Sequence, residues 1–182
     1  LRWELGDSAF WAGVRNYQSD PALIYGFATT EQFFQHMEQA SGRNLSRFQQ
    51  DWFYGQGYPN CQLRLSSEGS GIYRLRIGQA SSHASVPFFQ MKIPVRIAGS
   101  GQDTTMVFSP DSSGQEFLIS LPFVPSSLVF DPIKWLLAKS SVQIVTSSQT
   151  EVQARSLPKI APNPFGDSLE ISLEKFPATV RI

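Results

Sequence analysis

Apolar residues follow a helical spacing over the first third of the chain. Phe10, Trp11, Val14 and Tyr17 recur three or four positions apart, so they line one face of a predicted helix. Asp7 suits the N-cap of this helix, which is expected to end near Ser19 because a proline follows Asp20.

Two further helices are predicted before residue 55. Thr29–Gln32 has the residue types of a capping box, and Gly42 follows the last apolar position of this helix. Asn44 suits the N-cap of a third helix, and Gly55 lies beyond its end. Residues 1–55 are therefore expected to form short helices rich in tryptophan and phenylalanine.

From Cys61 onward the apolar residues alternate with polar ones, as in strands with one wet face. Glu68–Gly71 reads as a hairpin turn between the first two strands, and Ile133–Leu137 as an apolar cluster that closes one edge or end of the sheets. Recurrence of strands about every 10–12 residues is typical of an antiparallel sandwich. The expected runs are 62–65, 72–77, 91–97, 104–108, 117–121 and 128–130.

The change of periodicity predicts an α+β fold with four successive parts. Residues 1–58 are expected to be a helical segment, and residues 59–145 an antiparallel β-sandwich. The polar run 146–157 reads as a linker. Residues 158–182 read as the truncated start of a further module, with a turn and an alternating strand.

Charge and length narrow the class of protein. The 182 residues carry 15 basic and 15 acidic side chains, so no net field draws the chain to nucleic acid. No apolar run reaches the roughly 18–20 residues of a membrane span, and no secretory leader is visible. Leu1–Gly6 reads as the interior of a helix already in progress, and we therefore expect a piece of a longer protein.

A hydrolytic zinc site on helices needs two histidines one turn apart and a carboxylate. The chain has His36 and His83, which are expected on a helix and in a loop. We interpret His36, next to Glu38, as a solvated surface pair, and His83 as a polar loop residue. Asp103 and Asp111 lie in separate turns without the dense acidic spacing of a calcium loop.

No nucleophile motif is present either. No serine lies in Gly-x-Ser-x-Gly, and Cys61 reads as a half-buried strand residue, with no second cysteine for a disulfide. Gly55 and Gly57 lack the third glycine of a phosphate loop and are interpreted as a turn. We assign no catalytic, cofactor-binding or metal-binding residue to this chain.

Four segments together resemble the end of the catalytic domain of aminopeptidase N-type zinc metallopeptidases, which are gluzincin aminopeptidases. They are Leu1–Asp7, Tyr25–Phe33, Met37–Leu45 and Trp52–Pro59. The segment Leu128–Leu137 resembles the end of the β-sandwich that follows in that family, so the likeness covers about residues 1–140. It implies an immunoglobulin-like β-sandwich after the helical end of a thermolysin-like domain.

The resemblance also implies where the chemistry lies. In the family, zinc is held by His-Glu-x-x-His and a later Glu, a Gly-rich motif grips the substrate amine and a Tyr stabilises the oxyanion. None of these matches a position here, so zinc and catalysis are expected upstream of Leu1. Tyr25 and Tyr54 fall in segments that resemble structural parts of the family. The chain is then expected to brace the upstream domain of a parent that removes N-terminal residues from peptides.

The segment Ala161–Ile171 resembles the opening of the C-terminal sorting domain that Bacteroidetes attach to cargo of their type IX secretion system. This resemblance implies a parent that crosses the outer membrane and is secreted or held at the cell surface. It also implies the type IX secretion machinery as a partner of the C-terminal tail.

Two alternatives stay open. One is a stand-alone adhesion or carbohydrate-binding sandwich, for which an exposed row of Tyr73, Phe88, Phe89 and Phe117 would be needed, although their pattern suits a core better. The other is a scaffold from a family member that has lost its metal. If the helices lie against a missing domain, an apolar patch around residues 3, 10 and 11 is expected to be exposed or buried by self-association.

Overall fold

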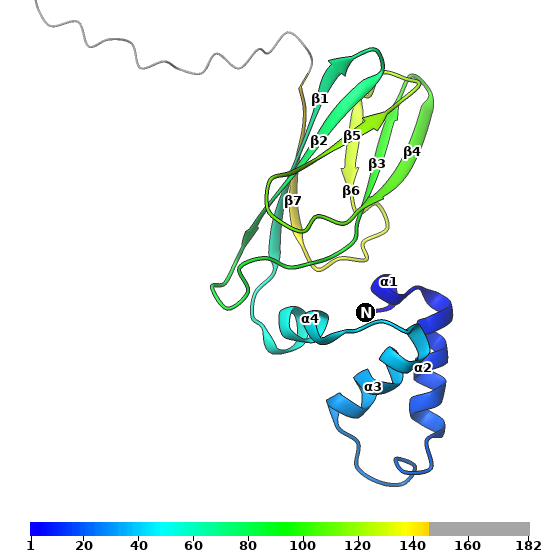
Figure 1. Ribbon diagram of the computed structural model, residues 1–182. Coiled ribbons are helices and arrows are strands. Elements are labelled where there is room, and N and C mark those ends of the chain that lie inside the picture. Colours follow the sequence, from blue (N-terminus) through cyan, green and yellow to red (C-terminus); the bar gives the residue numbers. More distant parts are fainter. Residues whose placement is uncertain (146–182) are drawn as a thin grey trace, which may run out of the picture. The chain divides into compact units, whose positions relative to one another are not determined.

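Helices precede strands along the chain, as the change of periodicity predicts (Figure 1). The structure is a computed structural model and describes residues 1–145. The fold is α+β, with short helices and two β-sheets. The linker expected at 146–157 and the module expected at 158–182 lie outside the described residues.

The helical part contains four α-helices and one turn of π-helix. They are α1 (Arg2–Leu5), α2 (Asp7–Ser19), α3 (Thr30–Ser41), α4 (Ser46–Gln49) and the π-helix η1 (Gln50–Tyr54). The capping box of α3 is confirmed, with Thr29 Oγ1 accepting from Gln32 N, and Gly42 ends this helix with φ +64°. The prediction that Asp7 caps α2 is wrong. Gly6 holds that position, and the Asp7 carboxylate accepts from Arg2 instead.

A small apolar core holds the helices together. Phe34, Met37 and Leu45 are buried in it. At Gly13 a Cβ atom would lie 2.6 Å from Met37 Sδ and 3.2 Å from Met37 Cα, so α2 and α3 approach closely where glycine leaves room.

Within residues 1–145, seven strands form two sheets. The order is β5-β2-β1-β7 in the first sheet and β4-β3-β6 in the second. Six strands lie where alternation predicts them, although their ends differ. The bounds are β1 (Pro59–Gly69), β2 (Ile72–Ser81), β3 (Ile93–Gly99), β4 (Gln102–Phe108), β5 (Gln115–Ser120), β6 (Ser127–Phe130) and β7 (Lys139–Val145).

The seventh strand corrects the expectation of a purely antiparallel arrangement. Strand β7 pairs in parallel with β1, whereas every other strand pair of the two sheets is antiparallel. Two hairpins have tight Ser-Gly turns, Ser70–Gly71 and Ser100–Gly101, in which all four residues have positive φ. Positive φ at both central residues is what a type I′ hairpin turn requires.

The inward residues of the two sheets form one apolar core. It includes Leu63 and Leu65 of β1, Leu75 of β2 and Val95 and Ile97 of β3, which are all buried. Because residues of both sheets share one cluster, the sheets pack face to face, as a β-sandwich requires.

Candidate functional site

The helices make most of their polar contacts with the sandwich through residues 82–92, the connection between β2 and β3, which we call the receiving segment. Three groups of helical residues reach it: α1, the α4–η1 helices and the turn after η1. This helix–sandwich junction is the candidate functional site, because it carries the long-range polar contacts between the two parts.

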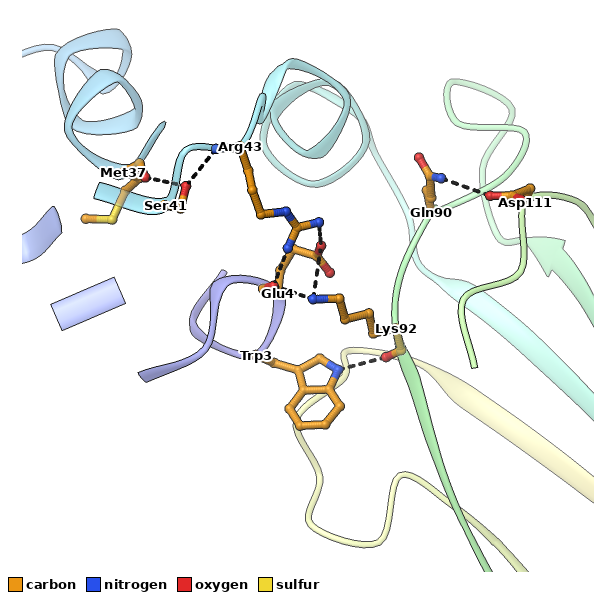
Figure 2. A network of polar contacts seen from close by, with 8 residues as sticks. All are labelled: Trp3, Glu4, Met37, Ser41, Arg43, Gln90, Lys92 and Asp111. Atoms are coloured by element: carbon orange, nitrogen blue, oxygen red, sulfur yellow. Dashed lines mark hydrogen bonds and ion pairs between the residues drawn. The ribbon is translucent and has the colours of Figure 1, made fainter. Parts of the chain in front are cut away.

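The first group centres on Glu4 at the C-terminal end of α1 (Figure 2). The main-chain carbonyl of Glu4 accepts from Arg43 Nη1 at 2.6 Å and from Lys92 Nζ at 2.7 Å. Its carboxylate also accepts from Arg43 and lies 3.7 Å from Lys92 Nζ. The last carbonyls of a helix have no partner within it, and cations near that end are favourable, so both side chains stabilise α1 on the sandwich.

Trp3 is a second residue of α1 that contacts the sandwich. Its indole Nε1 donates to the carbonyl of Lys92 at 2.8 Å, and its ring stacks on Trp135 with centroids 6.0 Å apart. The Arg2 guanidinium lies over both Trp11 and Trp135, at 5.4 and 5.3 Å from the ring centroids. These contacts are typical of cation–π interactions and join α1, α2 and the connection before β7.

The second group is an ion pair at the start of η1. Arg47 Nε donates to Asp51 Oδ2 at 2.8 Å, and Arg47 Nη2 donates to the carbonyl of Phe88 at 3.0 Å. The same Asp51 oxygen accepts from Gln90 N at 3.3 Å, and Asp51 is only 5% exposed. A buried carboxylate needs such partners, so this pair holds both helix and receiving segment in place.

Beneath this pair, aromatic packing continues into the sandwich. The rings of Trp52 and Phe89 lie 4.8 Å apart between centroids, and Phe89 is 1% exposed. The Gln79 side chain donates to the Phe89 carbonyl at 3.0 Å and accepts from Phe89 N at 2.6 Å. Both main-chain groups of Phe89 are thus satisfied by a side chain of β2, which ties the receiving segment to the sheet.

The third group is the glycine turn after η1. Gly57 has φ +95°, and a Cβ atom there would lie 2.7 Å from Ser82 Oγ. Tyr58 N donates to Ser82 Oγ at 2.8 Å, and Gln56 N donates to Ser85 Oγ at 2.9 Å. The interpretation of these glycines as a turn is confirmed, and Pro59 begins β1 directly after it.

The segment Leu128–Leu137 contains a buried carboxylate, that of Asp131, which accepts hydrogen bonds from the main chain of a turn. Asp131 is 1% exposed, and its oxygens accept from Trp135 N at 2.9 Å and Leu136 N at 2.7 Å. This capping fixes the turn that presents Trp135 to Trp3 and Arg2.

His36 lies within the helical part, and the sequence-based pairing was wrong. Its Nε2 lies 3.0 Å from Asp20 Oδ2, and its ring packs edge-on against Tyr17. Glu38 instead accepts from Leu45 N at 2.6 Å. The side chain of His36 is 16% exposed, so it is a partly buried link between α2 and α3 and not a solvated surface residue.

The other polar candidates lie apart from one another. His83 is exposed in the receiving segment, where its Nδ1 lies 2.9 Å from Ser85 Oγ. Asp103 pairs with Arg96, and Asp111 accepts from Gln90 Nε2 at 3.2 Å (Figure 2). Within residues 1–145, no group of three or more His, Cys, Asp or Glu side chains could hold a metal ion.

Cys61 is 1% exposed in β1, which is more buried than expected. Burial raises the pKa of its thiol to about 12. A buried thiol with a raised pKa is a poor nucleophile, because the thiolate is the reactive form. Cys61 therefore belongs to the core.

The four sandwich aromatics do not form an exposed row. Phe89 is buried, Tyr73 and Phe117 pack against the sandwich core, and Phe88 is half-buried. The faces of Trp135 are engaged by Trp3 and Arg2. The interpretation that the pattern of these aromatics suits a core is confirmed for Phe89, Tyr73 and Phe117.

The apolar patch expected on the first helices is wrong for two of its three residues. Trp3 is half-buried at the junction and Phe10 packs against the helical core, whereas Trp11 is 44% exposed. The more exposed apolar side chains are Tyr25 and Phe27, which are fully exposed in the connection between α2 and α3. Tyr25 also has φ +62°.

Tyr54 is half-exposed, and its hydroxyl donates to Glu31 Oε1 at 2.8 Å. This hydrogen bond lowers the pKa of Glu31 and raises the pKa of Tyr54. The contact joins η1 to α3.

No helix of the described part has both the length and the apolar character that a membrane crossing needs. Comparison with known proteins gives no further assignment: no protein-family model matches the chain, and no curated protein matches it.

Proposed function

We propose that this chain is the non-catalytic C-terminal region of a secreted zinc aminopeptidase of the aminopeptidase N type. In this proposal, the helices complete the catalytic domain of the parent, and the sandwich braces that domain. The parent holds zinc and removes N-terminal residues from peptides with groups upstream of Leu1. The tail beyond residue 157 is the signal that directs the parent to the type IX secretion system, and so to the medium or the cell surface.

The helix–sandwich junction is the observation that carries the bracing role. Three groups of helical residues engage one segment of the sandwich through Lys92, Phe88 and Ser82. An ion pair whose carboxylate is buried, and a glycine turn without room for a side chain, leave little freedom at this connection. A joint of this kind suits a brace better than a flexible tether.

The exposed apolar side chains at the far end of the helices also favour the proposal. Tyr25 and Phe27 are fully exposed, and Ile24 is 44% exposed in the same connection. Large apolar side chains gathered on a surface are typical of an interaction site. In the parent, we expect the catalytic part to cover this connection.

We propose further that the sandwich is immunoglobulin-like, as the family resemblance implies. Its four- and three-stranded sheets have the strand count of a seven-stranded immunoglobulin-type sandwich. Strand β7 pairs with β1 in parallel. A comparison of this sandwich with the immunoglobulin fold therefore has to account for one parallel strand pair.

Metal analysis and a peptidase assay test the proposal. The 182-residue chain is dialysed against zinc-free buffer after incubation with zinc and is then assayed on aminoacyl substrates, beside the parent protein. We expect background zinc and no hydrolysis for the chain, but one zinc ion and hydrolysis for the parent. Stoichiometric zinc retained by the chain alone, or a parent without activity, would count against the assignment.

A further inference from the structure

We propose that the outer face of β1 and β2 carries a binding site for a small oxyanion, namely a carboxylate, sulfate or phosphate group. The site is a shallow hollow of about 380 Å³, which we call the β1–β2 hollow. The hollow shares Gln79 with the helix–sandwich junction, but the inference is independent of the proposed function. The residues that matter in its lining are Gln62, Arg64, Arg76, Gly78, Ser113 and Gly114.

Two arginines stand at one wall of the hollow. Arg64 and Arg76 are direct register partners across the β1–β2 pair. Both residues line the hollow, so an oxyanion is attracted to the positive charge at this wall. A guanidinium group also binds an oxyanion through two parallel hydrogen bonds.

The acid nearest to Arg76 by register is engaged elsewhere. Glu116 of β5 is the cross-strand partner of Arg76, but its Oε2 accepts from Arg74 Nη1 at 2.6 Å. Arg74 also binds Glu68 at 2.7 Å, so these three residues form a separate network. Among the described residues, the Arg76 guanidinium has neither a hydrogen-bond acceptor nor an ion-pair partner. It is therefore available to a ligand.

A glycine forms the floor of the hollow. Gly78 follows Arg76 by two positions on the same face of β2, opposite Gln62. Its φ is not positive, and a Cβ atom there would meet Gln62 Cβ at an ordinary 3.6 Å. Neither backbone conformation nor packing requires glycine at this position. A glycine inside a strand weakens it, and such a glycine often marks a bulge, a tight bend or the close approach of a ligand or of another backbone. Gly78 lies in the regular part of the β1–β2 register, so it is not at a bulge.

The rim of the hollow is held in place by the connection before β5. Ser113 Oγ donates to the Gln79 carbonyl at 2.7 Å and accepts from Gln79 N at 2.8 Å. Gly114 N donates to the Ile77 carbonyl at 2.8 Å, and its φ of +84° leaves a Cβ position only 3.3 Å from Arg76 Nη2. The loop thus packs along the guanidinium group and preorganises it for binding.

Nuclear magnetic resonance of the full 182-residue chain tests this site. The ¹⁵N-labelled protein is titrated with sodium phosphate at ionic strength held constant with sodium chloride. We expect saturable shifts of the Gly78 and Gly114 amides and of Arg76 Nε. Parallel titrations with acetate and sulfate show which oxyanion the site prefers.

Three variants separate a built site from general charge effects. Arg76→Gln is expected to weaken binding at least about tenfold, because it removes the paired donors. Gly78→Ala is expected to weaken binding several-fold by filling the floor, while the melting temperature stays the same or rises. Arg96→Gln is the matched control, because Arg96 pairs with Asp103 on the other sheet, and it leaves binding unchanged.

Saturable phosphate, sulfate or acetate binding that Arg76→Gln weakens at least about tenfold would support the site. Shifts that grow linearly, or that sodium chloride reproduces, would overturn it. So would binding that Arg76→Gln leaves nearly unchanged, or that falls equally with Arg96→Gln.

Discussion

At the scale of residues, Glu4 joins three elements through one side chain and one carbonyl. Arg43 comes from the connection after α3, and Lys92 from the end of the receiving segment, so two distant cations meet at the end of α1. The Glu4 side chain is only 17% exposed, whereas Arg43 and Lys92 keep 45% and 35% of theirs exposed. Solvent therefore partly screens the ion pairs of Glu4 with Arg43 and Lys92. Their net contribution to the free energy of unfolding is smaller than that of a buried ion pair.

We predict that Glu4→Ala lowers the free energy of unfolding by about 1–2 kcal/mol, because two cations lose a carboxylate while the carbonyl contacts remain. Urea unfolding measures the change. Asp103→Ala, which removes an ion pair about half exposed on both sides, is the matched control and should cost less than about 0.5 kcal/mol. Equal losses for the two variants would contradict a special role for Glu4.

The contact between Tyr54 and Glu31 predicts a pH dependence. Because the Tyr54 hydroxyl lowers the pKa of Glu31 below its ordinary 4.5, the contact stabilises the fold above pH 4.5 and is lost as pH falls through the lower folded value. Carboxyl ¹³C titration should place the Glu31 pKa below 4.5, and Tyr54→Phe should raise it toward 4.5. Tyr73→Phe is the control and should leave it unchanged. A Glu31 pKa at or above 4.5 in the unmodified protein would contradict the contact.

Contacts between residues close in sequence can be predicted from their spacing, whereas contacts between distant residues cannot. The Arg47–Asp51 pair has the i, i+4 spacing of a helical ion pair, so the sequence alone is enough to indicate it. Glu4 and Lys92 stand 88 positions apart, and no local pattern brings them together. His36 was assigned to Glu38 because the two are close in sequence, yet tertiary packing places Asp20 beside it.

At the scale of elements, alternation predicts six of the seven strands and misses β7. Six of the seven residues of Lys139–Val145 are exposed or half-buried, because the strand pairs with β1 at the edge of its sheet. A strand of this composition lacks the apolar face that makes alternation visible. The π-helix was likewise unexpected, since one extra residue per turn leaves no clear mark on a five-residue segment.

The Asp131 carboxylate caps the turn that precedes β7, because it accepts from Trp135 N and Leu136 N. We predict that Asp131→Ala lowers the free energy of unfolding by about 2–4 kcal/mol, because two main-chain N–H groups lose their acceptor and alanine is strained at φ +43°. Asp131→Asn keeps one acceptor and tolerates this φ, so it should cost about half as much. Thermal and urea unfolding with tryptophan fluorescence measure both. An alanine variant as stable as the asparagine variant would contradict the capping role.

At the scale of the whole molecule, the contacts of the junction join the helices to the sandwich. Polar side chains such as Arg47 and Gln79 make their hydrogen bonds at the junction, and the thiol of Cys61 is buried. The helices and the sandwich belong to a single compact unit. The boundary between them could be predicted from the change in periodicity, but the junction could not, because its partners are far apart in sequence.

The most direct test of the central proposal is the sequence of the parent gene upstream of the Leu1 codon. We predict an open reading frame that encodes His-Glu-x-x-His, a later zinc-binding Glu and a Gly-rich exopeptidase motif. An upstream sequence without His-Glu-x-x-His would contradict the assignment to a zinc aminopeptidase.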